Sequence, residues 1–253
     1  MRGLYHATSS MLVNQVHLEH ISNNLANSST PGYKRSKVTY KTFPEILLCR
    51  TERIGNGKTT LAGPIGVSSG SIATDETVII QQPGALLLTE RELDLALQGV
   101  GFFAVDTPNG IRYTRDGNFI LNSEGLLVTP RGFPVMGEDG PIYLSTEKPY
   151  FDREGNIFVD GKQVDRIQVY IFAEDDELQR DGYNLFRVEG GANPVPAGAP
   201  LIFQGYLEES NVGFAEQMVE LIKVRRSYEA AQKVSQVCDR LLTRSANELG
   251  ALR

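Results

Sequence analysis

Hydrophobic positions near the start of the chain recur at seven-residue steps. The members of this N-terminal stripe are Leu4, Met11, Leu18 and Leu25, with Ala7, Val13 and Ile21 beside them. A seven-residue apolar period is typical of an amphipathic helix that packs along a second helix. The pattern stops at Asn27, and Pro31-Gly32 then favours a turn. We expect a helix over about residues 3–27, roughly 37 Å long.

A second stripe runs along the C-terminal forty residues. Its members are Phe214, Leu221, Tyr228, Leu242 and Leu249, with Val224, Ala231, Cys238 and Leu252 as a companion row. Ser210 and Asn211 are candidate helix caps. No Pro or Gly interrupts residues 214–249, so one amphipathic helix of about 55 Å is expected.

Between the two stripes the pattern changes to short apolar runs separated by turn residues. Asn109-Gly110, Asp116-Gly117, Glu124-Gly125, Asp139-Gly140, Glu154-Gly155 and Asp160-Gly161 stand between such runs from residue 99 onward. Gly and Asn accept the positive φ of tight hairpin turns. We therefore expect antiparallel hairpins here, including one closed by Asp116-Gly117. Residues 41–75, rich in Gly, Ser and Thr, are interpreted as an extended arm or a long hairpin.

These patterns predict an α+β fold. Long N- and C-terminal helices pair as a discontinuous coiled-coil domain, and an antiparallel β-rich domain lies between them in the chain. The expected segments are an N-terminal assembly helix and turn (1–40), an arm or linker (41–75), a central β-rich domain (76–205) and a C-terminal assembly helix (206–253). A long exposed apolar stripe is an association site, so each copy would contribute its pair of helices to an assembly.

Composition narrows the possible functions. The formal net charge is -6, and residues 51–205 carry most of the acidic excess. An acidic middle disfavours nucleic acids, because phosphate binding needs clustered Lys and Arg. Cys49 and Cys238 form neither a disulfide framework nor a metal cluster. No window is apolar enough for direct membrane insertion, and the first residues do not form an ordinary cleaved signal peptide.

Motifs that resemble chemical sites fail on spacing. Gly55–Thr59 lacks the first glycine of a phosphate-binding loop, because Glu52 occupies that position. Asp152–Asn156 has Ile157 where a calcium loop needs Gly. His17 and His20 have the spacing of a zinc pair, but no further ligand is nearby. We assign no catalytic residue, no cofactor-binding residue and no metal ligand, and we expect no cofactor.

Four stretches, in order along the chain, resemble the signatures of flagellar rod and hook axial proteins. They are residues 22–35 (SNNLANSSTPGYKR), 93–103 (LDLALQGVGFF), 113–119 (YTRDGNF) and 204–212 (QGYLEESNV), the last continued by 216–222 (EQMVELI) and 226–230 (RSYEA). The resemblance implies a helical domain from both chain ends around a hollow channel, with the β domain outside it. It also implies a helical homo-polymer, contacts with other rod and hook proteins, and unfolded export through the flagellar type III apparatus to the basal body.

Within that resemblance we assign the assembly interface to residues of the two stripes and the adjoining motifs. They are Leu4, Met11, Leu18, Ile21, Asn23, Asn24, Leu25, Asn27, Pro31, Gly32, Ser210, Asn211, Val212, Met218, Leu221, Val224, Tyr228, Ala231 and Leu242. Asn23, Asn24 and Asn27 either bond neighbouring backbone or simply end the helix. The expected function is a torque-transmitting subunit of the basal-body rod. Residues 134–142 look more like the proximal rod member, whereas 41–75 and 204–212 favour the distal member slightly.

Three other functions remain open from the sequence. The chain can be read as a hook-type axial protein, or as a secreted β-domain binding module with a helical stalk. The binding module would need a polar loop outside the family motifs, and residues 174–200 are the candidate for it. An enzyme such as a cell-wall hydrolase would need clustered acids in a cleft, and no pair of acids stands out.

Overall fold

The fold is known from a computed structural model that describes residues 2–42, 45–54, 58–69, 72–145, 148–172, 178–188, 194–198 and 200–250. The chain forms two compact units, each discontinuous in sequence. Unit 1 combines residues 1–25, 36–78 and 214–253, and unit 2 combines residues 26–35 and 79–213. Residues 26–35 and 206–213, which the sequence placed with the terminal helices, therefore belong to unit 2.

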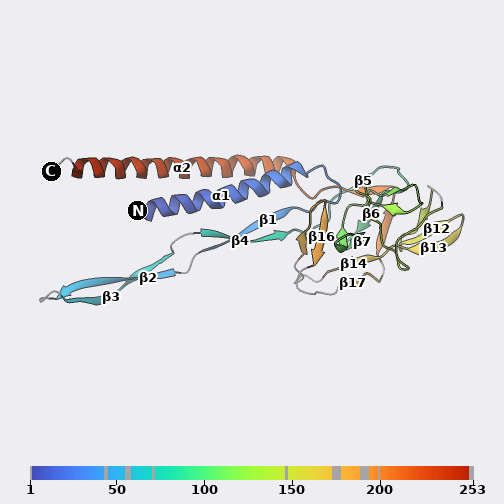
Figure 1. Ribbon diagram of the computed structural model, residues 1–253, viewed down its shortest axis with the longest axis horizontal. Helices are drawn as coiled ribbons and strands as arrows, with labels where there is room; N and C mark the ends of the chain where they lie inside the picture. Colours follow the sequence, from blue (N-terminus) through green and yellow to red (C-terminus); the bar gives the residue numbers. More distant parts are fainter. Residues whose placement is uncertain are drawn as a thin grey trace. The chain divides into compact units, whose positions relative to one another are not determined.

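Unit 1 contains both helices and two ribbons of two strands each (Figure 1). Its elements are α1 (Arg2–Ala26), β1 (Ser36–Thr42), β2 (Glu45–Ile54), β3 (Lys58–Ser69), β4 (Ile72–Ile79) and α2 (Phe214–Gly250). β1 pairs with β4, and β2 pairs with β3 in an antiparallel hairpin that spans ten residue pairs. Of the two interpretations of residues 41–75, the long hairpin is the observed one.

The helix boundaries follow from the sequence signals. α1 ends at Ala26, just before the Asn-Ser-Ser-Thr run and Pro31, and α2 begins at Phe214, three residues after Asn211. Both helices lie within one residue of their predicted limits. No helix among the described residues is long and apolar enough to cross a membrane.

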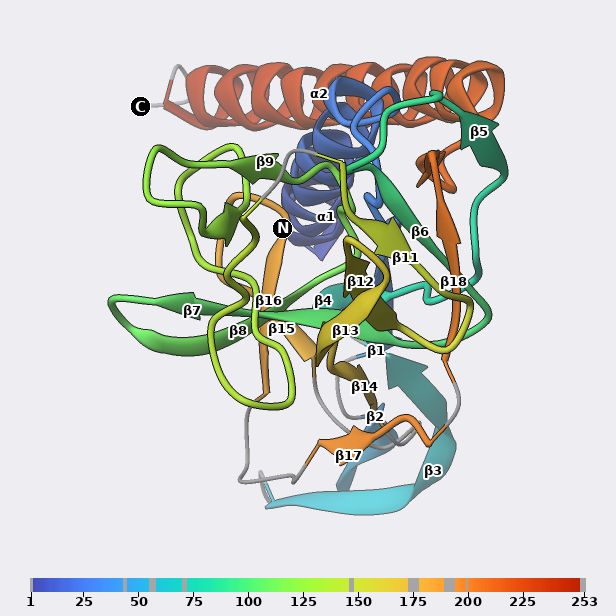
Figure 2. The same cartoon turned by 90° about the vertical axis from the view of Figure 1, so that its right-hand side faces the viewer.

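Unit 2 is built from short antiparallel strands (Figure 2). They are β5 (Leu86–Leu88), β6 (Leu95–Gln98), β7 (Phe102–Thr107), β8 (Gly110–Thr114), β9 (Ile120–Leu121), β10 (Leu127–Val128), β11 (Tyr150–Phe151), β12 (Asn156–Val159), β13 (Lys162–Arg166), β14 (Val169–Ile171), β15 (Leu178–Arg180), β16 (Leu185–Val188), β17 (Val195–Pro196), β18 (Leu201–Gln204) and β19 (Tyr206–Glu208). The largest sheet has the order β15-β16-β8-β7-β14-β17.

Most predicted turns close hairpins, but one does not. β7 pairs with β8 across Asn109-Gly110, and β12 pairs with β13 across Asp160-Gly161. The hairpin expected at Asp116-Gly117 was wrong, because β8 pairs with β7 and β16, while β9 pairs with β10. Gly117 instead permits a close backbone approach: a Cβ there would lie 1.6 Å from the carbonyl oxygen of Leu95.

The hydrophobic core of unit 2 is dense and aromatic. Phe103 and Phe119 are fully buried and meet edge to face, with ring centroids 5.2 Å apart. A second cluster, centred on Phe102, Tyr113, Phe172 and Phe186, occupies the other side of β7 and β8. Alternation of side chains along β7 explains the division, since successive residues face opposite sides of a sheet.

Candidate functional site

The two end motifs of the sequence meet inside unit 2. Residues 30–35 follow α1, and residues 204–212 contain the last residue of β18 and all of β19 and precede α2. The backbone N–H of Gly32 donates to the carbonyl of Glu208 over 2.7 Å, and that of Asn211 donates to the carbonyl of Tyr33 over 3.3 Å. Segments at opposite ends of the sequence are thus joined directly by backbone hydrogen bonds.

A buried ion triad of Lys34, Arg115 and Glu208 lies at this junction. Each residue is 2% exposed. Lys34 Nζ is 2.6 Å from Glu208 Oε1, and Arg115 Nε donates to Glu208 Oε2. The backbone N–H of Gly84 also donates to Glu208 Oε1 over 2.8 Å. The carboxylate therefore accepts three hydrogen bonds, which is what allows a charge to remain away from water.

The cations of the triad have further partners. Lys34 Nζ donates to the carbonyl of Gln82 over 3.0 Å, and Arg115 donates to the carbonyls of Leu97, Gly99 and Gly101. Burial lowers the pKa of Lys34 below its ordinary value, and this effect exceeds the opposing effect of its bond to Glu208. Loss of Glu208 would leave two buried cations without a carboxylate, so the triad depends most on this residue.

The Pro31-Gly32-Tyr33 turn packs against the triad. Gly32 has φ of +65°, and a Cβ there would lie 2.4 Å from the carbonyl carbon of Arg115. The guanidinium of Arg180 lies 4.2 Å from the centre of the Tyr33 ring and donates to the carbonyl of Lys34. Asn184 donates to the carbonyl of Pro31 over 2.9 Å. Only glycine fits the backbone conformation and the space at position 32.

The amide of Asn211 lies at the same junction. Its Oδ1 accepts from the backbone N–H of Arg35 over 2.6 Å, and its Nδ2 donates to the carbonyls of Ile80 and Gln82, each over 2.9 Å. Next to it, Ser210 Oγ accepts from the N–H of Val212 over 3.3 Å. Val212 is buried.

The predicted asparagines at the end of α1 differ from one another. Asn24 is 3% exposed; its side chain accepts from the backbone N–H of Ser36 over 3.1 Å and donates to the Ser36 carbonyl over 2.9 Å. It also donates to Gln217 Oε1 over 3.4 Å. Asn27 accepts from Thr30 through both its carbonyl and its side-chain oxygen, whereas Asn23 lies at an exposed position.

Polar side chains join the two helices within unit 1. Asn14 Nδ2 donates to Ser227 Oγ over 3.1 Å, and His17 Nε2 is 3.3 Å from Glu220 Oε1. A Cβ at Gly3 would lie 3.8 Å from Cys238 Sγ. Because the partner number on α2 falls as the number on α1 rises, the helices run antiparallel, and both termini lie at the same end of the pair (Figure 1).

Burial along α2 follows a single row. Its less exposed positions are Gln217, Glu220, Leu221, Val224, Tyr228, Ala231, Ser235 and Cys238, and apart from Glu220 they are spaced by four and three residues in turn. On α1 the less exposed positions are more numerous, and Ala7, Ile21 and Asn24 among them are buried. Burial on α2 stops at Cys238, opposite the start of α1, and residues 239–248 are all exposed. Two predicted interface residues, Met218 and Leu242, remain 38% and 45% exposed.

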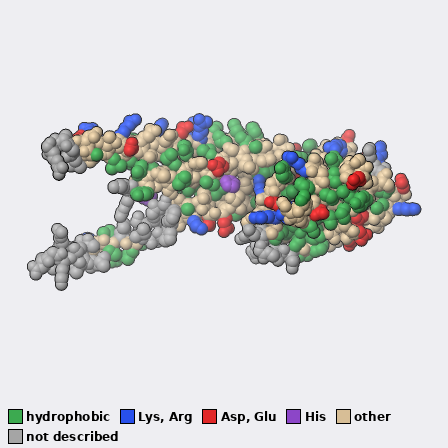
Figure 3. Space-filling model, in the orientation of Figure 1, with side chains coloured by type: hydrophobic (Ala, Val, Ile, Leu, Met, Phe, Trp, Pro, Cys, Tyr) green, Lys and Arg blue, Asp and Glu red, His purple; other side chains and the backbone are tan. Residues whose placement is uncertain are grey.

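Many large apolar side chains of unit 1 point to solvent, and the space-filling view shows some of them along the helices (Figure 3). On α2 they are Phe214, Met218, Val219, Ile222, Val234, Val237, Leu241 and Leu242. Leu12 of α1 and Leu47, Ile65 and Val67 of the β2–β3 hairpin are also exposed. So many solvent-facing apolar side chains are typical of a surface that is covered in an assembly.

Sequence reasoning missed the functional weight of Lys34, Arg115 and Glu208. All three lie inside the quoted motifs. Because charged side chains are usually exposed, burial of these three was not expected. One signal was available: Lys34 and Arg115 each follow a tyrosine by one or two positions, and Glu208 follows the apolar Leu207.

The resemblances to chemical sites gain no support. Among the described residues there is no group of three or more His, Cys, Asp or Glu placed to hold a metal ion. Gly55-Asn56-Gly57 of the loop that resembles a phosphate site and the acidic run 174–177 lie outside the described residues. His17 contacts Glu220 and the ring of Tyr40, and His20 contacts Ser36 and Thr77.

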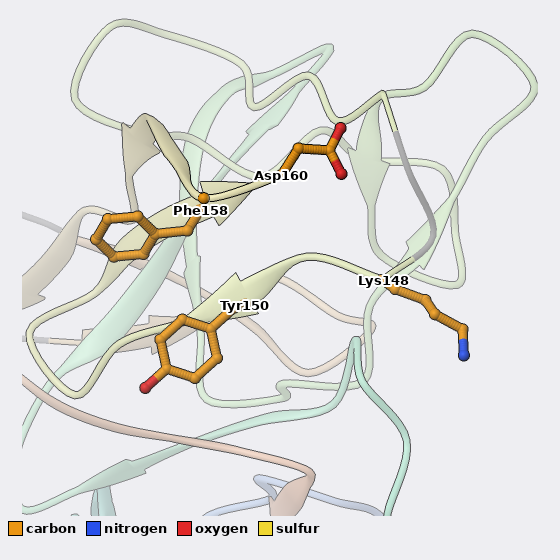
Figure 4. Close-up of a pocket in the computed structure, with 5 residues that line it drawn as sticks. Lys148, Tyr150, Phe158 and Asp160 are labelled. Atoms are coloured by element: carbon orange, nitrogen blue, oxygen red, sulfur yellow. The ribbon is translucent and has the colours of Figure 1, made fainter.

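A surface hollow in unit 2 is lined by Lys148, Tyr150, Phe158 and Asp160 with Gly161. The rings of Tyr150 and Phe158 lie together with centroids 6.1 Å apart, whereas Lys148 and Asp160 point away from them (Figure 4). The charged groups do not converge on one point, so the hollow has no arrangement for acid–base catalysis.

Comparison with known proteins identifies the family. Three family profiles match in chain order: "Flagella basal body rod protein" at residues 4–34, "Flagellar hook protein FlgE/F/G D1 domain" at 96–170, and "Flagellar basal body rod FlgEFG protein C-terminal" at 204–249. The first and last profiles cover α1 with the Pro31-Gly32 turn and nearly all of α2, and the middle one covers much of unit 2.

Curated relatives match over nearly their whole length. Flagellar basal-body rod protein FlgG of Bacillus subtilis is 33% identical over 98% of this chain and 98% of its own. Flagellar hook-basal body complex protein FlhO of the same organism is 32% identical over 100% of both chains. Flagellar basal-body rod protein FlgF of Caulobacter vibrioides is 32% identical over 99% of this chain and 98% of its own. The chain belongs to the flagellar basal-body rod protein family.

Proposed function

We propose that this chain polymerises through α1 and α2 into a hollow shaft that transmits motor torque, as a structural subunit of the rod in the basal body of the bacterial flagellum. Relatives named as rod proteins support the assignment of this chain to the rod and its location in the basal body. Relatives named FlgG, the distal-rod name, support the distal member over the proximal one.

The observation that carries the proposal is the exposed apolar surface of α2. Val219, Val234, Val237 and Leu241 are 52%, 51%, 53% and 62% exposed on a helix of 37 residues. A monomeric protein rarely leaves so many large apolar side chains in water along one element. Their burial between copies would release that surface from water and drive assembly.

We also propose that α1 and α2 pair as an antiparallel coiled coil. The burial steps of four and three residues along α2 are those of an a/d seam. The polar pairs Asn14–Ser227 and Asn24–Gln217 would fix the register, because a shift of one turn would leave these amides without partners.

The proposed assembly interface keeps the residues expected from sequence, in three roles. Leu4, Met11, Leu18, Ile21, Leu25, Leu221, Val224, Tyr228 and Ala231 hold the helix pair together, while Met218 and Leu242 are open to other copies. Asn23, Asn24, Asn27, Pro31, Gly32, Ser210, Asn211 and Val212 fix the ends of the helices. Other rod and hook proteins and the type III export apparatus are the proposed partners.

The experiment is a polymerisation assay by sedimentation and electron microscopy on purified protein. Leu241→Asp places a charge among the exposed apolar side chains of α2, and Gln236→Asp places the same charge at an exposed position that is already polar. We expect Gln236→Asp to form filaments like the wild type and Leu241→Asp to stay monomeric with an unchanged circular dichroism spectrum. Equal polymerisation of both variants would contradict the proposal.

A further inference from the structure

Unit 2 continues into unit 1 at four points of the chain, after residues 25, 35, 78 and 213. The last three of these points are reached by three segments of unit 2: residues 30–35, 79–85 and 205–213. All three lie side by side through backbone hydrogen bonds within unit 2. Ile80 donates to Arg35 over 2.8 Å, and Glu209 donates to Ala85 over 2.8 Å. We call these three segments the exit segments.

The side chain of Asn211 bonds to the other two exit segments at once. Its oxygen accepts from Arg35 N–H over 2.6 Å, and its nitrogen donates to the carbonyls of Ile80 and Gln82 over 2.9 Å each. Both donors of the amide are therefore used, and the acceptor is used as well. The residue itself belongs to the third segment, two residues before its last member, Gly213.

Neither of the nearest alternatives to asparagine can make this set of bonds. An aspartate keeps the acceptor for Arg35 but has no donor, and its charge would face the carbonyl oxygens of Ile80 and Gln82. A glutamine keeps the amide but adds a methylene, which moves it away from three fixed backbone partners. A leucine or alanine would leave the N–H and the carbonyls without their partner.

We propose that Asn211 is a positioning residue. Its side chain holds the three exit segments together as one stiff junction, through which force enters and leaves unit 2. This inference rests on the proposed function, because stiffness at this point matters only if the chain carries load. The triad contributes at the same place: Lys34 also donates to Gln82, and Glu208 accepts from Gly84. Asn211 differs from the triad residues because its side chain carries no charge and because it is the nearest of the four, in sequence, to the start of α2.

The test is hydrogen exchange with mass spectrometry on the full-length monomer, with Asn211→Ala, Asn211→Gln and a matched control. The control is Asn122→Ala, because Asn122 Oδ1 accepts two backbone hydrogen bonds, from Glu124 and Leu126, inside one hairpin. We expect Asn211→Ala to speed exchange of the amides of Arg35 and Ile80 by about tenfold, the loss expected for one or two backbone contacts. Asn122→Ala should speed exchange only in residues 122–126.

Filament stiffness supplies the second readout, measured as persistence length in electron micrographs. Both Asn211 variants should give filaments that bend more than wild type, whereas Asn122→Ala filaments should match wild type at a comparable loss of monomer stability. Unchanged exchange at Arg35 and Ile80, or unchanged stiffness in Asn211→Ala and Asn211→Gln, would overturn the inference. If the wild type forms no filaments, the proposed function fails, while the exchange result still decides whether Asn211 binds the segments.

Discussion

The two units of this chain differ in the hydrophobic core that each buries. In unit 2, Phe103, Phe119 and Leu127 are 0% exposed, and a buried ion triad has its hydrogen bonds satisfied. In unit 1, the β2–β3 hairpin is a ribbon of two strands, and Leu241 of α2 is 62% exposed. An isolated two-stranded hairpin is at best marginally stable in water.

This difference separates folding from assembly. Unit 2 has the buried core of an independent domain, so its stability should depend on its own residues. Unit 1 leaves apolar surface uncovered, and in the proposed assembly further chains cover it, so much of its order should depend on protein concentration. Substitutions in the two units should therefore change different measured quantities.

The largest expected effect belongs to the triad. Glu208→Ala leaves Lys34 and Arg115 buried without a carboxylate, and breaking a buried ion pair in this way costs about 3 to 5 kcal/mol. Urea unfolding followed by tyrosine fluorescence would measure this loss. Glu209→Ala is the control, because the Glu209 side chain is exposed and its backbone bond to Ala85 is kept. Equal stability of the two variants would show that the triad is not an anchor.

Gly32→Ala should have the next largest effect, about 2 to 3 kcal/mol in unfolding free energy. The cost combines a positive φ with a Cβ 2.4 Å from the backbone of Arg115. Gly132→Ala separates the two causes, because Gly132 has φ of +85° but nothing within 4 Å of a Cβ. We expect roughly 1 kcal/mol for Gly132→Ala, and a similar small loss at Gly32 would mean that the turn can move away from Arg115.

A pH-dependent effect follows from Asp116. Burial chiefly, with a contribution from Asp94, raises the pKa of Asp116 from 3.8 to about 6, against the opposing bond from the N–H of Asn118. Because the folded-state pKa exceeds the unfolded value, the folded chain holds this proton more tightly between pH 3.8 and about 6. Its contribution to the unfolding free energy therefore falls as the pH rises through that window.

Asp116→Asn removes this titration and keeps an oxygen for the Asn118 N–H. The variant should gain about 1 to 2 kcal/mol relative to wild type between pH 4 and pH 7.5, with partial exposure reducing the full linkage value. Thermal unfolding at a series of pH values would measure the gain. A constant difference between variant and wild type across that range would contradict the shifted pKa.

The smallest expected effect on the monomer belongs to the exposed apolar side chains of α2. Leu241→Ala should change the unfolding free energy of dilute protein by less than about 0.5 kcal/mol, since the side chain is already in water. Leu127→Ala, the same substitution in the core of unit 2, should cost about 2 to 5 kcal/mol. In the polymerisation assay the two variants should rank the other way. Leu241→Ala should raise the protein concentration needed for filaments more than Leu127→Ala protein that remains folded does.

From the sequence, elements with a clear hydrophobic period were predicted better than the contacts that those elements make with one another. The helices were placed to within a residue, because the stripes from Leu4 to Leu25 and from Leu221 to Cys238 have clear stops in Pro31 and Asn211. The long hairpin at 41–75 was one of two alternatives. Hairpins closed by two-residue turns were recognised from Gly and Asn, since those contacts are local.

Non-local packing could not be predicted. Asp116-Gly117 has the composition of a hairpin turn, but Gly117 is needed for the close approach of Leu95, a residue more than twenty positions earlier. Likewise, Glu208 meets Lys34 across 174 residues, and only the fold makes that meeting possible. Nor does the hydrophobic period show where along α2 the contacts with α1 end, because that depends on α1 being shorter than α2.

The most direct test of the difference between the units is hydrogen exchange of the wild-type chain, measured on dilute monomer and on assembled filaments. We predict that residues 79–145 of unit 2 are protected in both states, whereas α2 beyond Cys238 exchanges rapidly in the monomer and becomes protected in the filament. If residues 239–248 are as protected in the dilute monomer as β7 and β8, or remain unprotected in the filament, assembly through α2 is contradicted.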